Sequence, residues 1–310
     1  MKILFTGASS FTGFWYVRAL AAAGHEVVCP LTRELESYTG LRRERLNLLK
    51  PICRFATNAP FGSEPFLKLA AAEKFDQLCH HGADVTNYKS PDFDAAAAVR
   101  NNTQNLSATL KALRASGTQS VVLTGTYFEA GEGTGSEPLR TFSPYSHSKT
   151  LTFEAFALEC RAKHLTLGKF VMPNPFGPFE EPRFTAFLMK KWQAGQPVEV
   201  KTPDYLRDNI HADLLAAAYE TFSAQVAVAK VPQLKTNPSG YVETQGEFAQ
   251  RVQRAVQSRT GWRCELQLST QTDFGEPLRR ANTEAVAPQF PGWDERRAWD
   301  DFVEFYAHQL

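Results

Sequence analysis

Residues 2–13, KILFTGASSFTG, decide the fold of this chain. The first six residues predict a buried strand, and residues 11–23 predict a helix after a short polar loop. Gly7 allows the backbone to turn, and Gly13 allows the helix to pack closely on the strand. This strand–loop–helix order predicts that the helix N-terminus holds a pyrophosphate, as in dinucleotide-binding folds. Ser10 stands where such loops have a middle glycine, and we expect its side chain to narrow the approach.

Strand-like and helix-like stretches alternate over residues 1–172. Four more short apolar runs read as strands: HEVVCPL, FDQLCHHGA, SVVLTGT and LTLGKFVM. Among the helix-like stretches between them, residues 95–117 predict one long helix, and residues 145–164 predict another. This alternation predicts an α/β fold, a Rossmann-type doubly wound parallel sheet with helices on both faces.

A second, smaller domain is expected to begin at residue 173. Four prolines cluster there, at positions 173, 175, 178 and 182, and strand signals become sparse. Residues 173–310 are therefore interpreted as a mixed substrate-binding domain. About residues 204–235 contain one more helix of the first kind, and we expect them to return to the first domain.

Composition and charge narrow the classes of function. The formal net charge of +1 over 310 residues predicts no nucleic-acid or anionic-membrane partner, and no apolar run approaches the length of a membrane span. Five scattered cysteines form no disulfide or zinc pattern, which favours a reducing cytoplasm. His80 and His81 are adjacent in a strand and face opposite sides, so no shared metal is expected.

The second strand carries the signal for the dinucleotide's ribose. An NAD site normally ends this strand in an acid that binds the 2′-hydroxyl, whereas Leu31 holds that position here, followed by Thr32 and Arg33. A guanidinium can pair with a 2′-phosphate, so NADP(H) is favoured and NAD(H) remains possible. Glu34 follows directly and complicates this interpretation.

A tyrosine and a lysine lie four residues apart in TFSPYSHSKT, residues 141–150. In a helix, Tyr145 and Lys149 share one face. A phenol titrates near pKa ~10, and a neighbouring ammonium lowers that value. The pair is therefore a candidate for a tuned proton donor and acceptor, although an isolated pair of this kind is more often a plain polar helix face.

Taken together, the motifs resemble those of the extended short-chain dehydrogenase/reductase family, the branch that acts on nucleotide sugars. The resemblance covers nearly the whole chain. Besides the glycine loop and the Tyr-x-x-x-Lys pair, it rests on HHGA (80–83), VRNNTQNL (99–106), LTGTYFEAG (123–131), MPNPFGP (172–178) and RDNIHADLLA (207–216).

The resemblance implies a role for each matching residue. Tyr145 gives or takes the proton, Lys149 tunes the phenol and holds the nicotinamide ribose, and Thr126 hydrogen-bonds the reacting oxygen. Together with the loop chemistry, it predicts cofactor contacts from Gly7, Ser9, Ser10, Phe11, Gly13, Thr32, Arg33, His81, Gly82, Ala83, Asn102, Thr124, Tyr145, Lys149 and Pro173. Substrate contacts are expected from Lys89, Thr126, Asn174, Arg207 and Arg280, the last as part of an Arg279–Arg280 pair. The resemblance also implies a homodimer.

Two reactions and one non-catalytic function stay open on the sequence. Related 4,6-dehydratases carry an Asp-Glu pair directly after the catalytic threonine, whereas Tyr127 and Phe128 stand here, so dehydration is not expected. The prediction is NADPH-dependent reduction of a nucleotide-linked 4-keto-6-deoxy sugar. The first alternative is an NAD-dependent nucleotide-sugar 4-epimerase. The alternative of another class is a non-catalytic, NADP-binding redox sensor, which the complete Thr126, Tyr145 and Lys149 set argues against.

Overall fold

A computed structural model describes residues 1–309. The chain divides into two compact units. The first comprises residues 1–132, 140–172 and 216–237, and the second comprises residues 133–139, 173–215 and 238–310. Two stretches differ from the expected boundaries. Residues 133–139 group with the second unit because β6 (Thr134–Gly135) pairs with β15 (Arg280–Ala281), and the return to the first unit begins at residue 216 rather than near 204.

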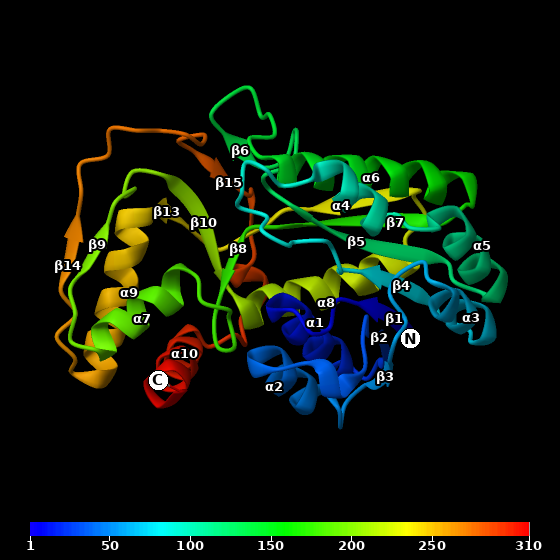
Figure 1. The fold of residues 1–310 in the computed structure, drawn as a ribbon, viewed down its shortest axis with the longest axis horizontal. Helices are drawn as coiled ribbons and strands as arrows, with labels where there is room; N and C mark the ends of the chain where they lie inside the picture. Colours follow the sequence, from blue (N-terminus) through cyan, green and yellow to red (C-terminus); the bar gives the residue numbers. More distant parts are fainter. Residues whose placement is uncertain (310) are drawn as a thin grey trace. The chain divides into compact units, whose positions relative to one another are not determined.

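The first unit is built on a seven-stranded sheet in which every pairing is parallel (Figure 1). From edge to edge the strands are β11 (Gln233–Thr236), β7 (Thr166–Met172), β5 (Ser120–Thr126), β4 (Gln77–His80), β1 (Lys2–Thr6), β2 (Glu26–Pro30) and β3 (Arg54–Ala56). The order of the strands reverses between β4 and β1, and ligands of such sheets bind outside the carboxyl ends at this point. The predicted doubly wound sheet is confirmed.

Helices cover both faces of this sheet (Figure 1). One face carries α3 (Glu64–Ala72), α4 (Ala95–Asn102), α5 (Leu106–Ser116) and α6 (Pro144–Ala162). The other carries α1 (Phe11–Ala22), α2 (Gly40–Leu49) and the part of α8 (Ala212–Val228) from residue 216. Leu110, Phe156 and other apolar side chains fill the first face, while Tyr16 and Tyr219 stack at 4.0 Å between ring centroids on the second.

The single helix expected over residues 95–117 is wrong, since α4 and α5 are separate helices. Asn105 adopts a left-handed conformation with φ +48°, which no regular helix accommodates. Its side-chain amide donates to the Gly62 carbonyl at 2.8 Å. Thr103 bonds back to the Val99 carbonyl with its hydroxyl at 2.7 Å. Short polar side chains that satisfy backbone groups in this way compete with helix propagation.

The second unit combines short strands with three long helices. Its strands are β6, β8 (Asn174–Phe176), β9 (Val198–Val200), β10 (Leu206–His211), β12 (Pro238–Ser239), β13 (Tyr241–Thr244), β14 (Leu266–Leu268), β15 and β16 (Glu284–Ala285). Its helices include α7 (Phe184–Gln193), α9 (Gln245–Thr260) and α10 (Glu295–Gln309). β10 pairs antiparallel with β13 and parallel with β8, so the sheets are mixed as predicted. Aromatic residues from α10, Trp299 and Phe302 among them, pack with Phe176 and Phe248 into its core.

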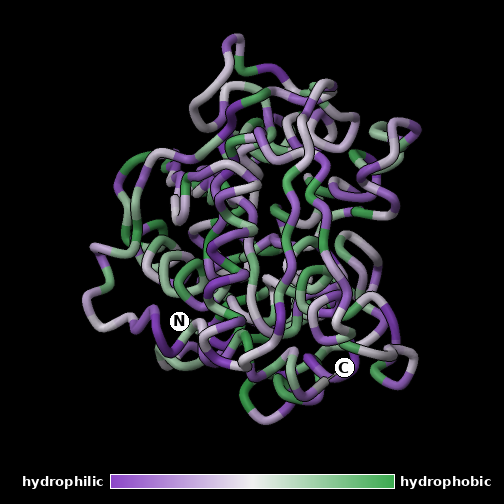
Figure 2. The backbone as a smooth tube through the Cα atoms, turned by 90° about the vertical axis from the view of Figure 1, so that its left-hand side faces the viewer, coloured by the Kyte–Doolittle hydropathy of each residue, from purple (hydrophilic) through white to green (hydrophobic). Residues whose placement is uncertain are grey.

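Apolar and polar residues are interspersed along the trace of the backbone (Figure 2). Two further short helical turns, η1 (Leu35–Ser37) and η2 (Ala287–Gln289), complete the elements. Among residues 1–309, no helix has the length and apolarity needed to cross a membrane.

Candidate active site

Tyr145 and Lys149 lie one turn apart at the beginning of α6. Pro144 occupies the first helical position, where its fixed φ and missing N–H cost nothing, and Ser143 and Ser146 form a capping box. The start of this helix, and with it the placing of Tyr145, is thus determined by local sequence.

The two side chains differ in their surroundings. The Lys149 side chain is buried, and its Nζ donates a 2.6 Å hydrogen bond to the carbonyl oxygen of Thr124 in β5. The Tyr145 ring is half-buried and meets the rings of Tyr88 and Phe93 edge-on, with centroids 5.3 and 5.8 Å away. Lys149 is therefore anchored to the end of the sheet, while Tyr145 lies among aromatic rings.

The end of β5 carries the third predicted group. Thr126 is the last residue of the strand and is buried. Its Oγ1 accepts a long hydrogen bond from the Phe128 N–H at 3.4 Å, and its own N–H donates to the Glu129 carboxylate at 2.7 Å. Because Thr124 holds Lys149 and Thr126 ends the same strand, β5 joins two of the three predicted catalytic residues.

Burial and neighbouring charges set the protonation of this region. Burial lowers the pKa of Lys149, the Glu129 carboxylate opposes that shift, and the Lys169 ammonium adds to it. Burial and then the charge of Lys149 lower the pKa of His80 and of His81 to about 3. Both imidazoles are therefore neutral near pH 7, and they act as hydrogen-bonding groups rather than as cations.

The glycine loop has the close approach that a dinucleotide cradle needs. Gly7 has φ +84°, and a Cβ placed on it would lie 2.8 Å from the Gly82 nitrogen. A Cβ on Gly13 would lie 2.2 Å from the Gly7 oxygen. The turn, the helix start and the loop after β4 thus meet with no room for side chains at these positions, which fits a pyrophosphate held at the N-terminus of α1.

The Ser10 side chain forms hydrogen bonds with the backbone of its own loop. Its hydroxyl donates to the Gly7 carbonyl at 2.8 Å and accepts from the Gly13 N–H at 3.1 Å, so it caps α1. Its backbone N–H donates to the Gly7 oxygen at 3.0 Å. The expectation that the Ser10 side chain narrows the approach is not met, because the side chain is bonded back to the loop's own backbone. Ser9 and Phe11 flank it at the start of the helix.

The buried His81 side chain forms hydrogen bonds with residues of the glycine loop and of α1. Its Nε2 lies 2.9 Å from the Thr12 hydroxyl and 3.1 Å from the Ser10 hydroxyl, and its Nδ1 lies 3.0 Å from the Thr124 hydroxyl. The histidine therefore links the glycine loop to β5. Gly82 donates its N–H to the Thr6 hydroxyl at 3.0 Å, and Ala83 follows, partly exposed.

Two further predicted residues, Asn102 and Lys89, differ in their burial. Asn102 is buried at the end of α4, where its side-chain oxygen accepts from the Asp84 N–H at 2.8 Å and its amide reaches the Thr152 hydroxyl at 3.4 Å. Asn102 thus fixes the loop that follows Ala83. Lys89 is exposed in this loop, with its ammonium 5.9 Å from the Tyr88 ring centroid.

The segment after β2 presents a cation. The Leu31 side chain is buried, so it offers no polar group to a ribose. Arg33 is exposed, and its guanidinium lies 4.6 Å from the centroid of the Tyr38 ring. Thr32 and Tyr38 share a 3.1 Å hydrogen bond between hydroxyls, and the Glu34 carboxylate accepts from the Asn58 amide.

The remaining predicted residues belong to the second unit. Arg207 in β10 is buried, and its guanidinium pairs with Glu276 at 2.8 Å and donates to the Pro277 carbonyl at 3.0 Å. Arg280 in β15 has no exposed surface, whereas its neighbour Arg279 is exposed. Pro173 is buried, and Asn174 opens β8 opposite Asn209 of β10.

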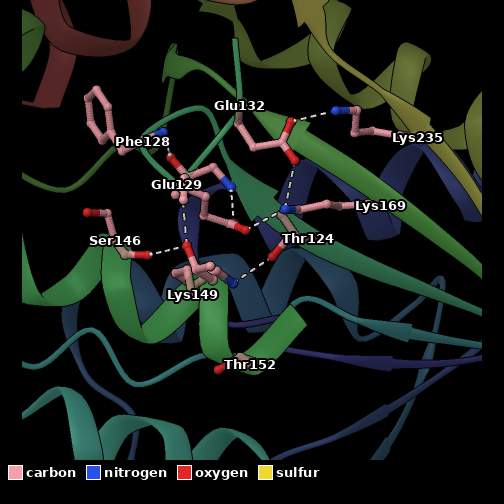
Figure 3. Close-up of polar contacts among 12 residues, drawn as sticks. Thr124, Phe128, Glu129, Glu132, Ser146, Lys149, Thr152, Lys169 and Lys235 are labelled. Carbon is pink, nitrogen blue, oxygen red and sulfur yellow. Dashed lines mark hydrogen bonds and ion pairs between the residues drawn. The ribbon is translucent and has the colours of Figure 1, made fainter. Parts of the chain in front are cut away.

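Sequence reasoning missed a buried ion cluster at the carboxyl end of β5. Lys169 of β7 lies between the carboxylates of Glu129 and Glu132, at 2.5 and 2.8 Å, and Lys235 reaches Glu132 at 3.0 Å (Figure 3). A usable signal was present, since Lys169 is a charge inside the apolar run LTLGKFVM. A lysine there needs an anion, but the sequence does not say which one.

Within residues 1–309, no group of histidine, cysteine and acidic side chains has the arrangement of a metal site. His80 and His81 turn to different partners: the Nδ1 of His80 lies 3.0 Å from the Thr6 hydroxyl, and its ring contacts Phe61 and Phe156.

Comparison with known proteins supplies a family and a set of related folds. The profile described as "NAD dependent epimerase/dehydratase family" matches residues 3–233. Curated proteins gave no match. Solved structures with the same fold include UDP-glucose 4-epimerase of Thermus thermophilus with NAD (21% identity, 100% of each chain, TM-score 0.69) and UDP-glucose 4-epimerase of Thermotoga maritima with UDP-glucose (17%, 99% of this chain and 98% of that one, 0.74). A third is a variant UDP-glucuronic acid 4-epimerase of Bacillus cereus with a fluorinated UDP-glucuronic acid and NAD (18%, 100% of each chain, 0.76).

Proposed function

The chain belongs to the NAD dependent epimerase/dehydratase family, within the extended short-chain dehydrogenases/reductases, and on that premise we propose that it is a nicotinamide-dinucleotide-dependent oxidoreductase of nucleotide-linked sugars. One observation carries the proposal. Lys149, one helical turn from Tyr145, is held by a 2.6 Å bond to Thr124, two residues before Thr126 on the same strand. A phenol, an ammonium and a hydroxyl are thereby carried by two adjoining elements.

Each of these side chains has a chemical task in oxidation or reduction at a sugar carbon. The dinucleotide, when bound at the glycine loop, supplies or accepts the hydride. Tyr145 moves the proton of the sugar oxygen, and the Lys149 ammonium favours the phenolate. The Thr126 hydroxyl stabilises charge that develops on the same oxygen.

For the reaction itself, we propose reduction of a 4-keto-6-deoxy sugar nucleotide with NADPH. Arg33 is exposed three residues after the end of β2, where a 2′-phosphate would lie, and Leu31 gives no acid for a 2′-hydroxyl. Glu129 is the first carboxylate after Thr126, and it is fully buried against Lys169. It is therefore not placed to remove a substrate proton in a dehydration.

A second candidate is a 4-epimerase that retains NAD. The observation in its favour is that the three solved structures named above are UDP-sugar 4-epimerases, two of them with NAD. The Glu34 carboxylate, which now accepts from Asn58, is an acid near the end of β2 that an adenine ribose could engage instead.

The test is a calorimetric titration of cofactor-stripped protein with NADPH and NADH in parallel, at one salt concentration. We expect NADPH to bind at least about tenfold more tightly, and Arg33→Ala to remove this preference, because a lost guanidinium–phosphate pair costs more than about 1 kcal/mol. Arg18→Ala is the matched control, since Arg18 is also exposed and lies 5.0 Å from the Trp15 ring. Preference for NADH, or NAD that cannot be removed, would favour the epimerase.

We propose in addition that the enzyme is a cytoplasmic homodimer. The resemblance to this family supports the dimer. The five free cysteines of the chain support a reducing compartment such as the cytoplasm. Light scattering of the purified full chain would measure its mass in solution, and a monomer at micromolar concentration would contradict the dimer.

A further inference from the structure

A lysine in the middle of a buried strand holds two carboxylates from one loop. Lys169 is 3% exposed and contacts Glu129 Oε2 at 2.5 Å and Glu132 Oε1 at 2.8 Å. Its ammonium also lies 4.1 Å from the Phe153 ring centroid on α6. Ion pairs this deep in a protein are costly to form and strongly destabilising to break on one side only, so the arrangement needs an explanation beyond stability.

Glu129 connects this cluster to the end of β5. Its Oε1 accepts the Thr126 N–H at 2.7 Å, while its backbone N–H donates to the Thr126 carbonyl at 3.0 Å. Glu129 therefore holds both backbone groups of Thr126, and Lys169 holds the other carboxylate oxygen of Glu129. The position of Thr126 is fixed by a side chain and not only by its sheet neighbours.

Gly125 makes room for this contact. A Cβ at position 125 would lie 2.7 Å from Glu129 Oε1 and 2.9 Å from Lys169 Cε. The ion pair thus packs directly against the backbone of the strand, one residue before Thr126 and one after Thr124, which anchors Lys149.

The charges of the buried cluster, taken together with Lys149, balance. Glu129 and Glu132 carry two negative charges, and Lys169 and Lys149 carry two positive charges; Lys235, the outer partner of Glu132, is 45% exposed and solvated. The other titratable groups around Lys149 are His80 and His81 at the end of β4, both neutral, and Tyr145 on its own helix. Glu129 is the anion that acts on Lys149, and Lys169 is the opposing cation.

We propose that Glu129 is a positioning residue for the reaction, one that fixes the strand end bearing Thr126 and balances the charge of the buried Lys149 ammonium, with Lys169 as its ion-pair partner. The catalytic consequence rests on the proposed function. The contact itself does not, because it can be measured without turnover.

Glu129→Gln is the informative change. It retains an oxygen that can accept the Thr126 N–H but removes the charge, which leaves two buried cations facing one buried carboxylate. We expect the midpoint of Lys149 titration to fall by at least about one pH unit, a tenfold change in its proton dissociation constant. The alkaline limb of the pH profile of kcat should move down by a similar amount.

The Lys149 midpoint is read by NMR of the cofactor-free full chain labelled with [13C]lysine at Cε. Loss of one resonance in Lys149→Arg assigns it. The matched control is Glu64→Gln, the same chemical change in the exposed Glu64–Lys68 pair, and it should leave the Lys149 midpoint where it is.

A second variant keeps the test decisive if Glu129→Gln does not fold. Lys169→Met combined with Glu132→Gln removes one charge of each sign and leaves Glu129 facing Lys149. The Lys149 midpoint should then rise, opposite to its shift in Glu129→Gln, because a nearby cation is lost and the nearby anion stays.

The outcomes separate this inference from the proposed function. An unchanged Lys149 midpoint in folded Glu129→Gln, or a shift in the same direction in both variants, overturns the electrostatic role of Glu129. A shifted midpoint with an unmoved alkaline limb of kcat overturns its role in the reaction. Shifted midpoints in a protein that binds neither NADPH nor NADH would support the contact and reject the proposed function.

Discussion

At the scale of single residues, the site depends on one buried ammonium. Lys149 is the only one of the three predicted catalytic side chains that is both basic and buried, and its Nζ donates to the Thr124 carbonyl. Burial lowers the pKa of Lys149, and the Glu129 carboxylate opposes that shift. Its partner Tyr145 lies one turn away on α6, at a spacing that any helix at this position would provide. The spacing of Tyr145 and Lys149 is therefore determined within α6, whereas the pKa of Lys149 depends on Glu129, which lies outside this helix.

Tyr145→Phe tests the proton role directly. Phenylalanine keeps the ring contacts with Tyr88 and Phe93 but has no ionisable hydroxyl. We expect kcat to fall by about 10²–10⁴-fold while the dissociation constant of the cofactor stays within about twofold, since general acid–base catalysis contributes on this order. Steady-state kinetics and calorimetry measure both quantities. Turnover like that of the unchanged protein would rule out Tyr145 as the proton donor.

At the scale of elements, the break between α4 and α5 shapes the region beside the site. α4 ends at Asn102, whose side chain fixes the loop after β4 through Asp84 and reaches Thr152 of α6. The local sequence predicts a continuous helix over residues 95–117. In such a helix Asn105 would have helical backbone angles, and its side-chain hydrogen bond to the Gly62 carbonyl would be lost. The left-handed residue at 105 thus redirects the chain.

Substitutions at Asn105 measure the cost of that turn. Asn105→Ala should destabilise the protein by about 1–2 kcal/mol more than Asn105→Gly, because alanine is strained in the left-handed conformation and glycine is not. Both changes lose the 2.8 Å bond to the Gly62 carbonyl, so the difference isolates the backbone term. Urea unfolding gives the two free energies. An alanine variant at least as stable as the glycine variant would mean that the chain accepts a continuous helix here.

At the scale of the whole molecule, two neutral histidines couple stability to pH. His80 and His81 have a pKa of about 3 in the fold, because of burial and then the charge of Lys149, against about 6.5 in an unfolded chain. Between these values the unfolded state binds more protons than the folded state. The free energy of unfolding is therefore at its full value above about pH 6.5 and falls as pH is lowered toward 3.

The slope of that fall is the measurable quantity. Well below pH 6.5, each histidine should remove about 1.4 kcal/mol from the free energy of unfolding per pH unit. Carboxylates whose pKa is lowered in the fold, such as Glu132, contribute only at lower pH, around their usual value of 4.5. Urea unfolding between pH 5 and 6 gives the slope of the free energy of unfolding against pH. In His80→Gln this slope should be about half of that in the unchanged protein. An unchanged slope would show that His80 is protonated in the folded state.

The sequence by itself determined whatever depends on neighbours along the chain. The apolar run before TGASSFTG, the glycines that permit its turn, the Pro144 start of α6 and the Tyr145–Lys149 spacing all act within a few residues, so pattern and propensity were sufficient. The α/β class followed from repeating such units, and the parallel sheet and the family are both confirmed.

Only the tertiary structure decided which distant groups meet. Glu129 pairs with Lys169, far along the chain, because β5 and β7 are neighbours in the sheet, and no pattern in either segment names the other. The α4–α5 break depends on Gly62, and the inward turn of the Ser10 hydroxyl depends on the folded glycine loop beside His81. Burial and ion pairing are properties of three-dimensional contact, so they set the charge of Lys149 only once the sheet has formed.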